Sequence, residues 1–147
     1  MEPVVFQQRL NGSIRTFILV LGALSLLGAA VSWMFQRNLL ELVIYLAAAA
    51  FFFLCLLIKV TMTVHEAGID LTMLGGIADV HLPASSIKGV TLGPTTGLKE
   101  GAGIRFIGNA EGLIVGGPTI KIERTTAPYL VSMANPDEAI AAINRCF

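Results

Sequence analysis

Residues 16–58 read TFILVLGALSLLGAAVSWMFQRNLLELVIYLAAAAFFFLCLLI, two apolar runs separated by the short polar segment QRNLLE at 36–41. The first run, 16–35, carries no charge, and as a helix it would span about 30 Å, the thickness of the hydrocarbon core of a bilayer. The second run is uncharged over 42–58 and, with its start placed at Leu40, reaches the lower end of the spanning range. Backbone amides in lipid need partners within their own segment, so both runs are predicted to be helical. The sequence therefore predicts a transmembrane hairpin over 16–58, with spans at about 16–35 and 40–58.

Two other interpretations of the first run are weaker. Arg9 and Arg15 precede an apolar stretch that ends in small residues, as in a secretory signal peptide. The run is longer than the usual apolar core of such a peptide, however, and a second span follows at once. A buried helical pair in a soluble protein would need more surrounding structure than 147 residues provide.

The N-terminal residues 1–15 are predicted to be a tail or a short interfacial segment, because Pro3 and Gly12 interrupt any regular element. Two spans put both termini on the same side of the membrane. The basic residues close to the spans on that side are Arg9, Arg15 and Lys59, against Arg37 alone in the loop. The tendency of positive residues to stay inside then predicts that both termini are cytoplasmic.

Small residues recur in the first span at spacings of three and four, and so share one helical face. They are Gly22, Ser25, Ala29 and Ser32. The alanine run of the second span offers Ala47 and Ala50. Because small residues let helices approach closely in lipid, we expect these faces to pack on each other within the hairpin. A contact site for another membrane subunit is the alternative.

The charges of residues 59–147 and the positions of the two cysteines limit the possible functions and linkages. The segment carries seven basic residues against eight acidic ones, with no run of Lys or Arg, which excludes nucleic acid as a partner. Cys55 lies within an apolar run and Cys146 is next to last, so a disulfide between them is not expected.

The periodicity changes after Lys59. Apolar and polar residues alternate with period two over 60–65, 69–73, 77–82 and 119–124, and shorter strand candidates lie between and after them. Asn135-Pro136-Asp137-Glu138 then predicts a helix, because Asn is a good N-cap, Pro fits the first helical position and the Glu side chain can reach back to the cap. Its apolar stripe is Ala139, Ile140 and Ile143.

The order of these elements resembles the pleckstrin-homology-like (PH-like) domains found behind transmembrane hairpins in small bacterial membrane proteins. The resemblance covers about residues 60–146 and rests on VHEAGI at 64–69, LPASSIKGV at 82–90, GIR at 103–105 and YLVS at 129–132. It implies a domain at 60–147 that is an antiparallel sandwich or barrel of about seven short strands, capped by a C-terminal helix. It also implies a multi-pass protein of the bacterial inner membrane. A looser similarity of layout, to PH-like proteins that assist the assembly of photosynthetic complexes, implies a class of partner.

No catalytic, cofactor or metal site is predicted. In the PH domains that bind phosphoinositides, basic residues surround the first hairpin loop, whereas the turn at 65–68 reads HEAG. Scattered candidates for surface docking are Lys88, Lys99 and Arg105. His65 and His81 occupy polar strand positions, and no Cys, His or carboxylate stands beside them at a spacing typical of metal sites.

Two functions from different classes follow. The first is a non-catalytic accessory, structural or assembly subunit of a larger membrane complex, such as a respiratory or photosynthetic one. It would dock on other membrane-protein subunits through its hairpin and its cytoplasmic PH-like domain. The second is a membrane-anchored sensory or binding module that recognises lipid headgroups or a peptide.

Overall fold

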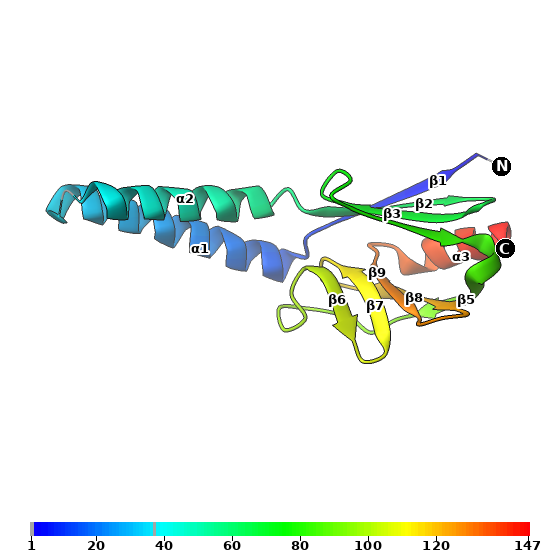
Figure 1. Cartoon of the computed structure of the whole chain (residues 1–147). Helices are drawn as coiled ribbons and strands as arrows, with labels where there is room; N and C mark the ends of the chain where they lie inside the picture. Colours follow the sequence, from blue (N-terminus) through cyan, green and yellow to red (C-terminus); the bar gives the residue numbers. More distant parts are fainter. Residues whose placement is uncertain (1, 37) are drawn as a thin grey trace. The chain divides into compact units, whose positions relative to one another are not determined.

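The chain forms two compact units in a computed structural model that describes residues 2–36 and 38–147. The helical unit is Gly12–Leu57, and the second unit joins Met1–Asn11 to Ile58–Phe147. The second unit contains two β-sheets and a C-terminal helix, so the whole chain is an α+β fold with one long apolar helix (Figure 1).

The helical unit consists of α1 (Gly12–Val31), a π-helical segment η1 (Ser32–Gln36) and α2 (Leu39–Cys55). The side chain of Asn38 caps α2 by accepting a hydrogen bond from the Leu40 amide at 3.1 Å. The first helix begins at Gly12 instead of at 16, and the second ends at Cys55 instead of at 58. Arg37, which entered the topology prediction, lies outside the described residues.

Helices α1 and α2 lie side by side and antiparallel. A Cβ atom built on Gly22 would lie 3.3 Å from Cζ of Phe53, and one built on Gly28 would lie 2.8 Å from Cε1 of Tyr45. Residues nearer the C-terminus of α1 therefore contact residues nearer the N-terminus of α2. At the loop end Ser32 Oγ donates a hydrogen bond to Glu41 Oε2 at 3.2 Å.

The first sheet has four strands in the order β1-β2-β3-β4, all antiparallel. They are β1 (Val4–Arg9), β2 (Lys59–His65), β3 (Gly68–Met73) and β4 (Ala78–Pro83). Strand β1 shows that the predicted tail at 1–15 is wrong, because six of its residues pair with β2. The sequence did not indicate this strand, because its partner β2 follows it only after the two apolar runs.

The second sheet has five strands in the order β5-β8-β9-β7-β6. They are β5 (Ile87–Leu92), β6 (Gly103–Ile107), β7 (Ala110–Ile114), β8 (Thr119–Arg124) and β9 (Tyr129–Ser132). Strands β7 and β9 are parallel, and the other pairs are antiparallel. For residues 60–147 about seven antiparallel strands were expected; the structure has eight there, β2 to β9, and the pair β7 and β9 is parallel instead of antiparallel.

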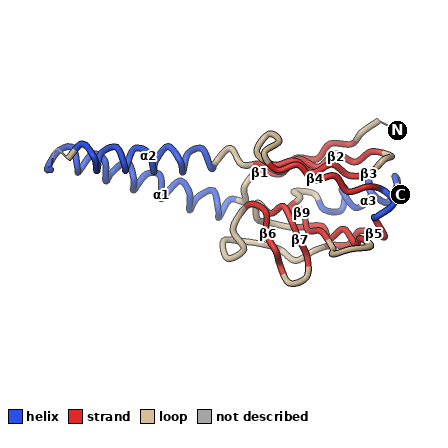
Figure 2. Tube along the Cα trace, viewed as in Figure 1, coloured by secondary structure: helices blue, strands red, loops and turns tan. Residues whose placement is uncertain are grey.

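The two sheets form two layers, with α3 (Pro136–Cys146) at one end (Figure 2). Helix α3 contacts β2, β5 and β8 and buries Ala139, Ala142 and Ile143. It begins where the sequence predicted, although Asn135 donates from its side-chain amide to Glu138 Oε2 at 3.2 Å instead of capping a backbone amide. The core of this unit includes the fully buried side chains Val60, Met62, Val64, Ile69, Leu71, Leu82, Leu113, Ile120 and Ile122.

Candidate functional site

Three polar side chains meet on the outer face of the first sheet. His65 ends β2, Asp70 lies in β3 and His81 lies in β4. The pairing register places Asp70 directly opposite His81, whereas His65 is opposite Gly68, two residues from Asp70 on the same face. The intervening side chains of Val64, Ile69 and Leu82 point inward and are fully buried. Strand alternation thus aims all three polar groups away from the core.

The carboxylate of Asp70 bridges the two imidazoles. His65 Nε2 lies 2.8 Å from Asp70 Oδ2, and His81 Nδ1 lies 2.5 Å from Asp70 Oδ1. The two imidazole rings are stacked, with centroids 6.0 Å apart and an angle of 24° between their planes. The side chains are 27%, 42% and 51% exposed for His65, Asp70 and His81, so solvent reaches the cluster.

The cluster favours the ionised form of its carboxyl group. The hydrogen bond from His81 holds the pKa of Asp70 below its usual range, burial opposes this shift, and the bond from His65 adds to the lowering. A carboxylate held beside two imidazole nitrogens is a donor set that fits a transition-metal ion.

The sequence offered no metal-site spacing around the histidines, yet the fold brings the Asp70 carboxylate between them. Positions 65, 70 and 81 match no metal-binding spacing along the chain. They meet because three consecutive strands form a meander whose register aligns them. The sequence did contain a signal that could have revealed the cluster: all three residues occupy the polar positions of the alternating pattern, in three strands predicted to follow one another.

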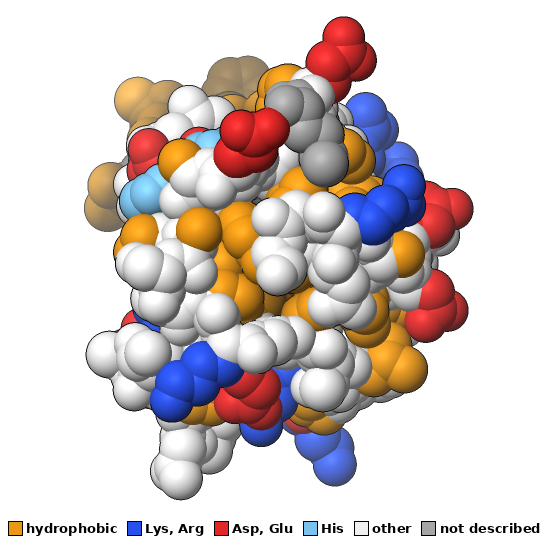
Figure 3. All heavy atoms as spheres, turned by 90° about the vertical axis from the view of Figure 1, so that its right-hand side faces the viewer, with side chains coloured by type: hydrophobic (Ala, Val, Ile, Leu, Met, Phe, Trp, Pro, Cys, Tyr) orange, Lys and Arg blue, Asp and Glu red, His pale blue; other side chains and the backbone are white. Residues whose placement is uncertain are grey.

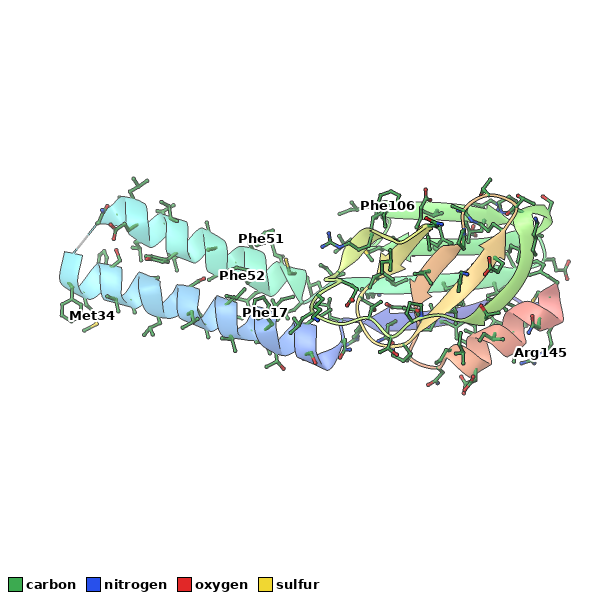
Figure 4. All side chains as sticks on the ribbon, turned by 90° about the horizontal axis from the view of Figure 1, so that it is seen from below. Phe17, Met34, Phe51, Phe52, Phe106 and Arg145 are labelled. Carbon is green, nitrogen blue, oxygen red and sulfur yellow. The ribbon has the colours of Figure 1, made fainter. Side chains whose placement is uncertain are left out.

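The small residues of the first span lie mostly between the helices. Gly22, Ala29 and Ser32 are buried, whereas Ser25 is half-buried and donates its hydroxyl hydrogen to the Leu21 carbonyl at 2.9 Å. On α2 the buried alanine is Ala49, and both predicted residues, Ala47 and Ala50, are exposed. The contact face of α2 runs instead through Tyr45, Ala49 and Phe52, where Phe52 points toward α1 (Figure 4).

The three basic residues predicted for docking do not form one patch. Lys88 lies in β5 and Arg105 in β6, which are the opposite edges of the second sheet. Lys99 is exposed in the loop between these strands. Arg105 donates from Nη2 to the Ala102 carbonyl at 3.2 Å. Two apolar side chains of β6 flank Arg105 and are also exposed, Ile104 at 57% and Phe106 at 76% (Figure 4).

A groove of about 300 Å³ separates the free edge of β1 from α3. It is lined by Val4, Phe6, Glu138, Ala142, Arg145 and Cys146. Arg145 donates from Nε to the Ala141 carbonyl of its own helix at 3.1 Å.

Comparisons with known proteins find no family model, curated protein or solved structure that matches this chain. Among the described helices, the segment Gly12–Phe35 is long and apolar enough, by length and composition, to cross a membrane, and α2 is apolar but shorter.

Proposed function

We propose that this chain is a non-catalytic integral membrane protein in which α1 and α2 cross the bilayer as a hairpin. In this proposal it serves as an accessory or assembly subunit of a larger membrane complex. The β-sheet unit lies on the cytoplasmic side and docks on the neighbouring subunits.

The observation that carries the proposal is the apolar surface of the two helices. In the most apolar window of Gly12–Phe35 only 17% of the segment is buried inside the protein, unlike the core helix of a soluble protein. Large apolar side chains project outward from both helices, including Phe17, Leu24, Leu27, Ile44, Phe51 and Leu54. A contiguous apolar surface of this extent favours lipid or another membrane protein as its environment.

The connections of the helical unit also support an anchor. Arg9 at the end of β1 pairs with Lys59 at the start of β2, so the chain leaves and re-enters the sheet at neighbouring positions. Leu10 and Asn11 lead into α1, and Leu56 to Ile58 lead out of α2. Links this short restrict how far the sheets can move from the membrane, which favours docking on neighbours in the same membrane.

We infer that the β-sheet unit is a variant of the PH-like sandwich. The two layers and the terminal helix support this inference. The parallel pair β7 and β9 and the additional strand β1 depart from the layout that the resemblance implied. The alternative function, recognition of a lipid headgroup, has less support because Lys88, Lys99 and Arg105 are dispersed over the second sheet and its loop.

Membrane insertion is tested by cysteine labelling in intact bacterial cells. In a background with Cys55→Ala and Cys146→Ser, a reporter Asn38→Cys in the helix connection should react with an impermeant maleimide. A matched reporter Glu66→Cys, in the exposed turn between β2 and β3, should react only after the membrane is permeabilised. Equal labelling of both reporters in intact cells would contradict the hairpin.

The accessory role is tested by extraction from the native membrane in a mild detergent. We expect the chain to migrate with a fixed set of subunits, in constant ratio, through two different separations. A monomer that retains its full cellular activity would contradict this role.

A further inference from the structure

The side chains of His65, Asp70 and His81 each place one potential metal-ligand atom close to the other two. These three atoms, two imidazole nitrogens and one carboxylate oxygen, all lie within 4.8 Å of one another. Ligands about 2.0–2.2 Å from a shared Zn²⁺ ion lie within such a separation. Small rotations of the exposed side chains would therefore exchange the present hydrogen bonds for metal bonds.

The backbone beneath these side chains is fixed by the sheet. Each of the three residues belongs to a paired strand, and Asp70 and His81 face each other in the register. The neighbouring inward residues Val64, Ile69 and Leu82 have no exposed surface. Ligands on such strands start close to their binding geometry, so little ordering opposes metal binding.

The surrounding charge favours a cation. Residues 60–87 contain both histidines of the chain together with Glu66, Asp70 and Asp79, and no Lys or Arg. Figure 3 shows the histidine side chains beside carboxylates at one edge of this face, with the basic side chains elsewhere on it.

The donor types select among cations. Two imidazoles and one carboxylate suit Zn²⁺ and neighbouring late first-row ions, whereas Mg²⁺ and Ca²⁺ prefer oxygen ligands alone. We propose that His65, Asp70 and His81 form a binding site for one divalent transition-metal ion of the Zn²⁺ class. Three protein ligands leave at least one coordination position open to water on the exposed side.

The experiment is a Zn²⁺ titration of the full chain without an affinity tag, purified in detergent. We expect one Zn²⁺ per chain, measured by calorimetry and by competition with a chromogenic chelator, and no binding of Mg²⁺ under the same conditions. X-ray absorption of the loaded protein should show a first shell of nitrogen and oxygen with imidazole scattering. Zinc should also raise the melting temperature of the β-sheet unit.

Each of the variants His65→Gln, Asp70→Asn and His81→Gln should weaken Zn²⁺ binding at least about tenfold, since loss of even an outer-shell partner commonly costs that much. The matched control is Asp79→Asn, which removes a carboxylate from the same face of β4 and should change the affinity less than about threefold by screening alone. The melting temperature without zinc separates loss of a ligand from loss of the fold.

Three results would overturn the proposal. The first is wild-type protein that binds no Zn²⁺ and keeps only the hydrogen-bonded cluster. The second is stoichiometric binding that survives in the folded double variant His65→Gln/His81→Gln and disappears with Cys55→Ala/Cys146→Ser, which would assign the metal to thiols. The third is an Asp79→Asn variant as impaired as Asp70→Asn, which would indicate general attraction to the acidic surface.

Discussion

The phenol ring of Tyr129 is packed at the start of β9, with 3% of the residue exposed. Arg124 stacks its guanidinium over this ring, with Cζ 5.2 Å from the ring centroid, and Nη2 of Arg124 lies 3.8 Å from Glu111 Oε2. Burial raises the pKa of Tyr129, the negative charge of Glu111 raises it further, and Arg124 opposes the shift. The folded chain therefore favours the neutral phenol.

This raised pKa predicts a loss of stability at alkaline pH. The contribution is fully present below the pKa of an unfolded tyrosine, about 10, and is lost as the pH rises through the folded pKa. Tyr129→Phe keeps the ring, so we expect it to change the stability at pH 7 by less than about 1 kcal/mol and to flatten the alkaline decline. Urea titrations of the full chain from pH 8 to about pH 11, followed by circular dichroism, measure both effects. A Tyr129→Phe profile as steep as that of the wild type would contradict the assignment.

Gly68 is the residue at which the first sheet tolerates no side chain. Its φ of 154° is a conformation that L-residues rarely adopt, and a Cβ there would overlap the carbonyl oxygen of Leu82 in the neighbouring strand. We expect Gly68→Ala to destabilise the β-sheet unit by about 2–4 kcal/mol, through strain and overpacking together. The control is Gly89→Ala, because a Cβ on Gly89 meets no atom within 4 Å. Thermal unfolding of the two variants compares them directly, and equal melting temperatures would refute the close approach.

The residue types of the His65–Asp70–His81 cluster were visible in the sequence, but their proximity was not. Each pair is separated along the chain by a turn, and only the register decides whether two polar positions face each other or slip apart. The two-residue turn at Glu66-Ala67, which pairs His65 with Gly68, sets the first of these registers. A one-residue slip would have moved Asp70 to the buried face.

At the scale of elements, strong local periodicity predicted well and long-range pairing did not. The alternating segments at 60–65, 69–73 and 119–124 correspond closely to β2, β3 and β8. The pairing of β1 with β2 and the parallel pairing of β7 with β9 were missed, because both helices separate β1 from β2 along the chain and β8 separates β7 from β9. Pairings of this kind depend on the packed core, which no short window of sequence contains.

The packing of α1 on α2 shows the same limit. Spacing alone indicated Gly22, Ala29 and Ser32 on α1. On α2, four successive alanines point to every side of the helix, so spacing could not indicate which of them contacts α1. In the structure Ala49 is the buried alanine, and Tyr45 and Phe52 also contact α1.

This packing predicts opposite outcomes for two matched substitutions. Gly22→Leu would push a side chain into Phe53 and Phe52, and we expect it to weaken the association of the helices by roughly 1–3 kcal/mol. Ala47→Leu makes the same increase in size at an exposed position and should change the stability by less than about 0.5 kcal/mol. Titration of each variant from mild detergent into a denaturing one, followed by helical circular dichroism, separates them. A larger effect of Ala47→Leu than of Gly22→Leu would show that α2 contacts α1 through a different face from the one seen in the structure.

At the scale of the whole molecule, the helical unit is an insertion between two adjacent strands of one sheet. Arg9 and Lys59 are paired neighbours, and the β-sheet unit takes residues from both sides of the insertion. A fragment that begins at Lys59 therefore lacks the edge strand β1. It exposes the edge of β2, and an unpaired edge of this kind favours aggregation.

The insertion predicts that a soluble β-sheet unit can be made by closing the sheet directly. We propose to join Asn11 to Ile58 through two glycines, which connects β1 and β2 by a loop of ordinary hairpin length. Leu10 and Asn11 are kept because Leu10 is buried and the Asn11 amide donates to the Val115 carbonyl at 2.8 Å. We expect this shortened chain to remain in solution without detergent and to unfold in one cooperative transition, measured by circular dichroism.

The matched control is the fragment 58–147, which contains the same core but lacks β1. Six residues of β1 pair with β2, and Phe6 lines the groove beside α3, so the fragment loses hydrogen bonds and apolar contacts together. It should unfold at lower temperature than the joined chain and exchange the amide hydrogens of β2 faster. Equal stability and equal exchange in the two proteins would show that β1 contributes nothing to the sheet. The N-terminal segment would then be the tail that the sequence suggested, and Lys59 alone would connect the helical unit to the paired strands.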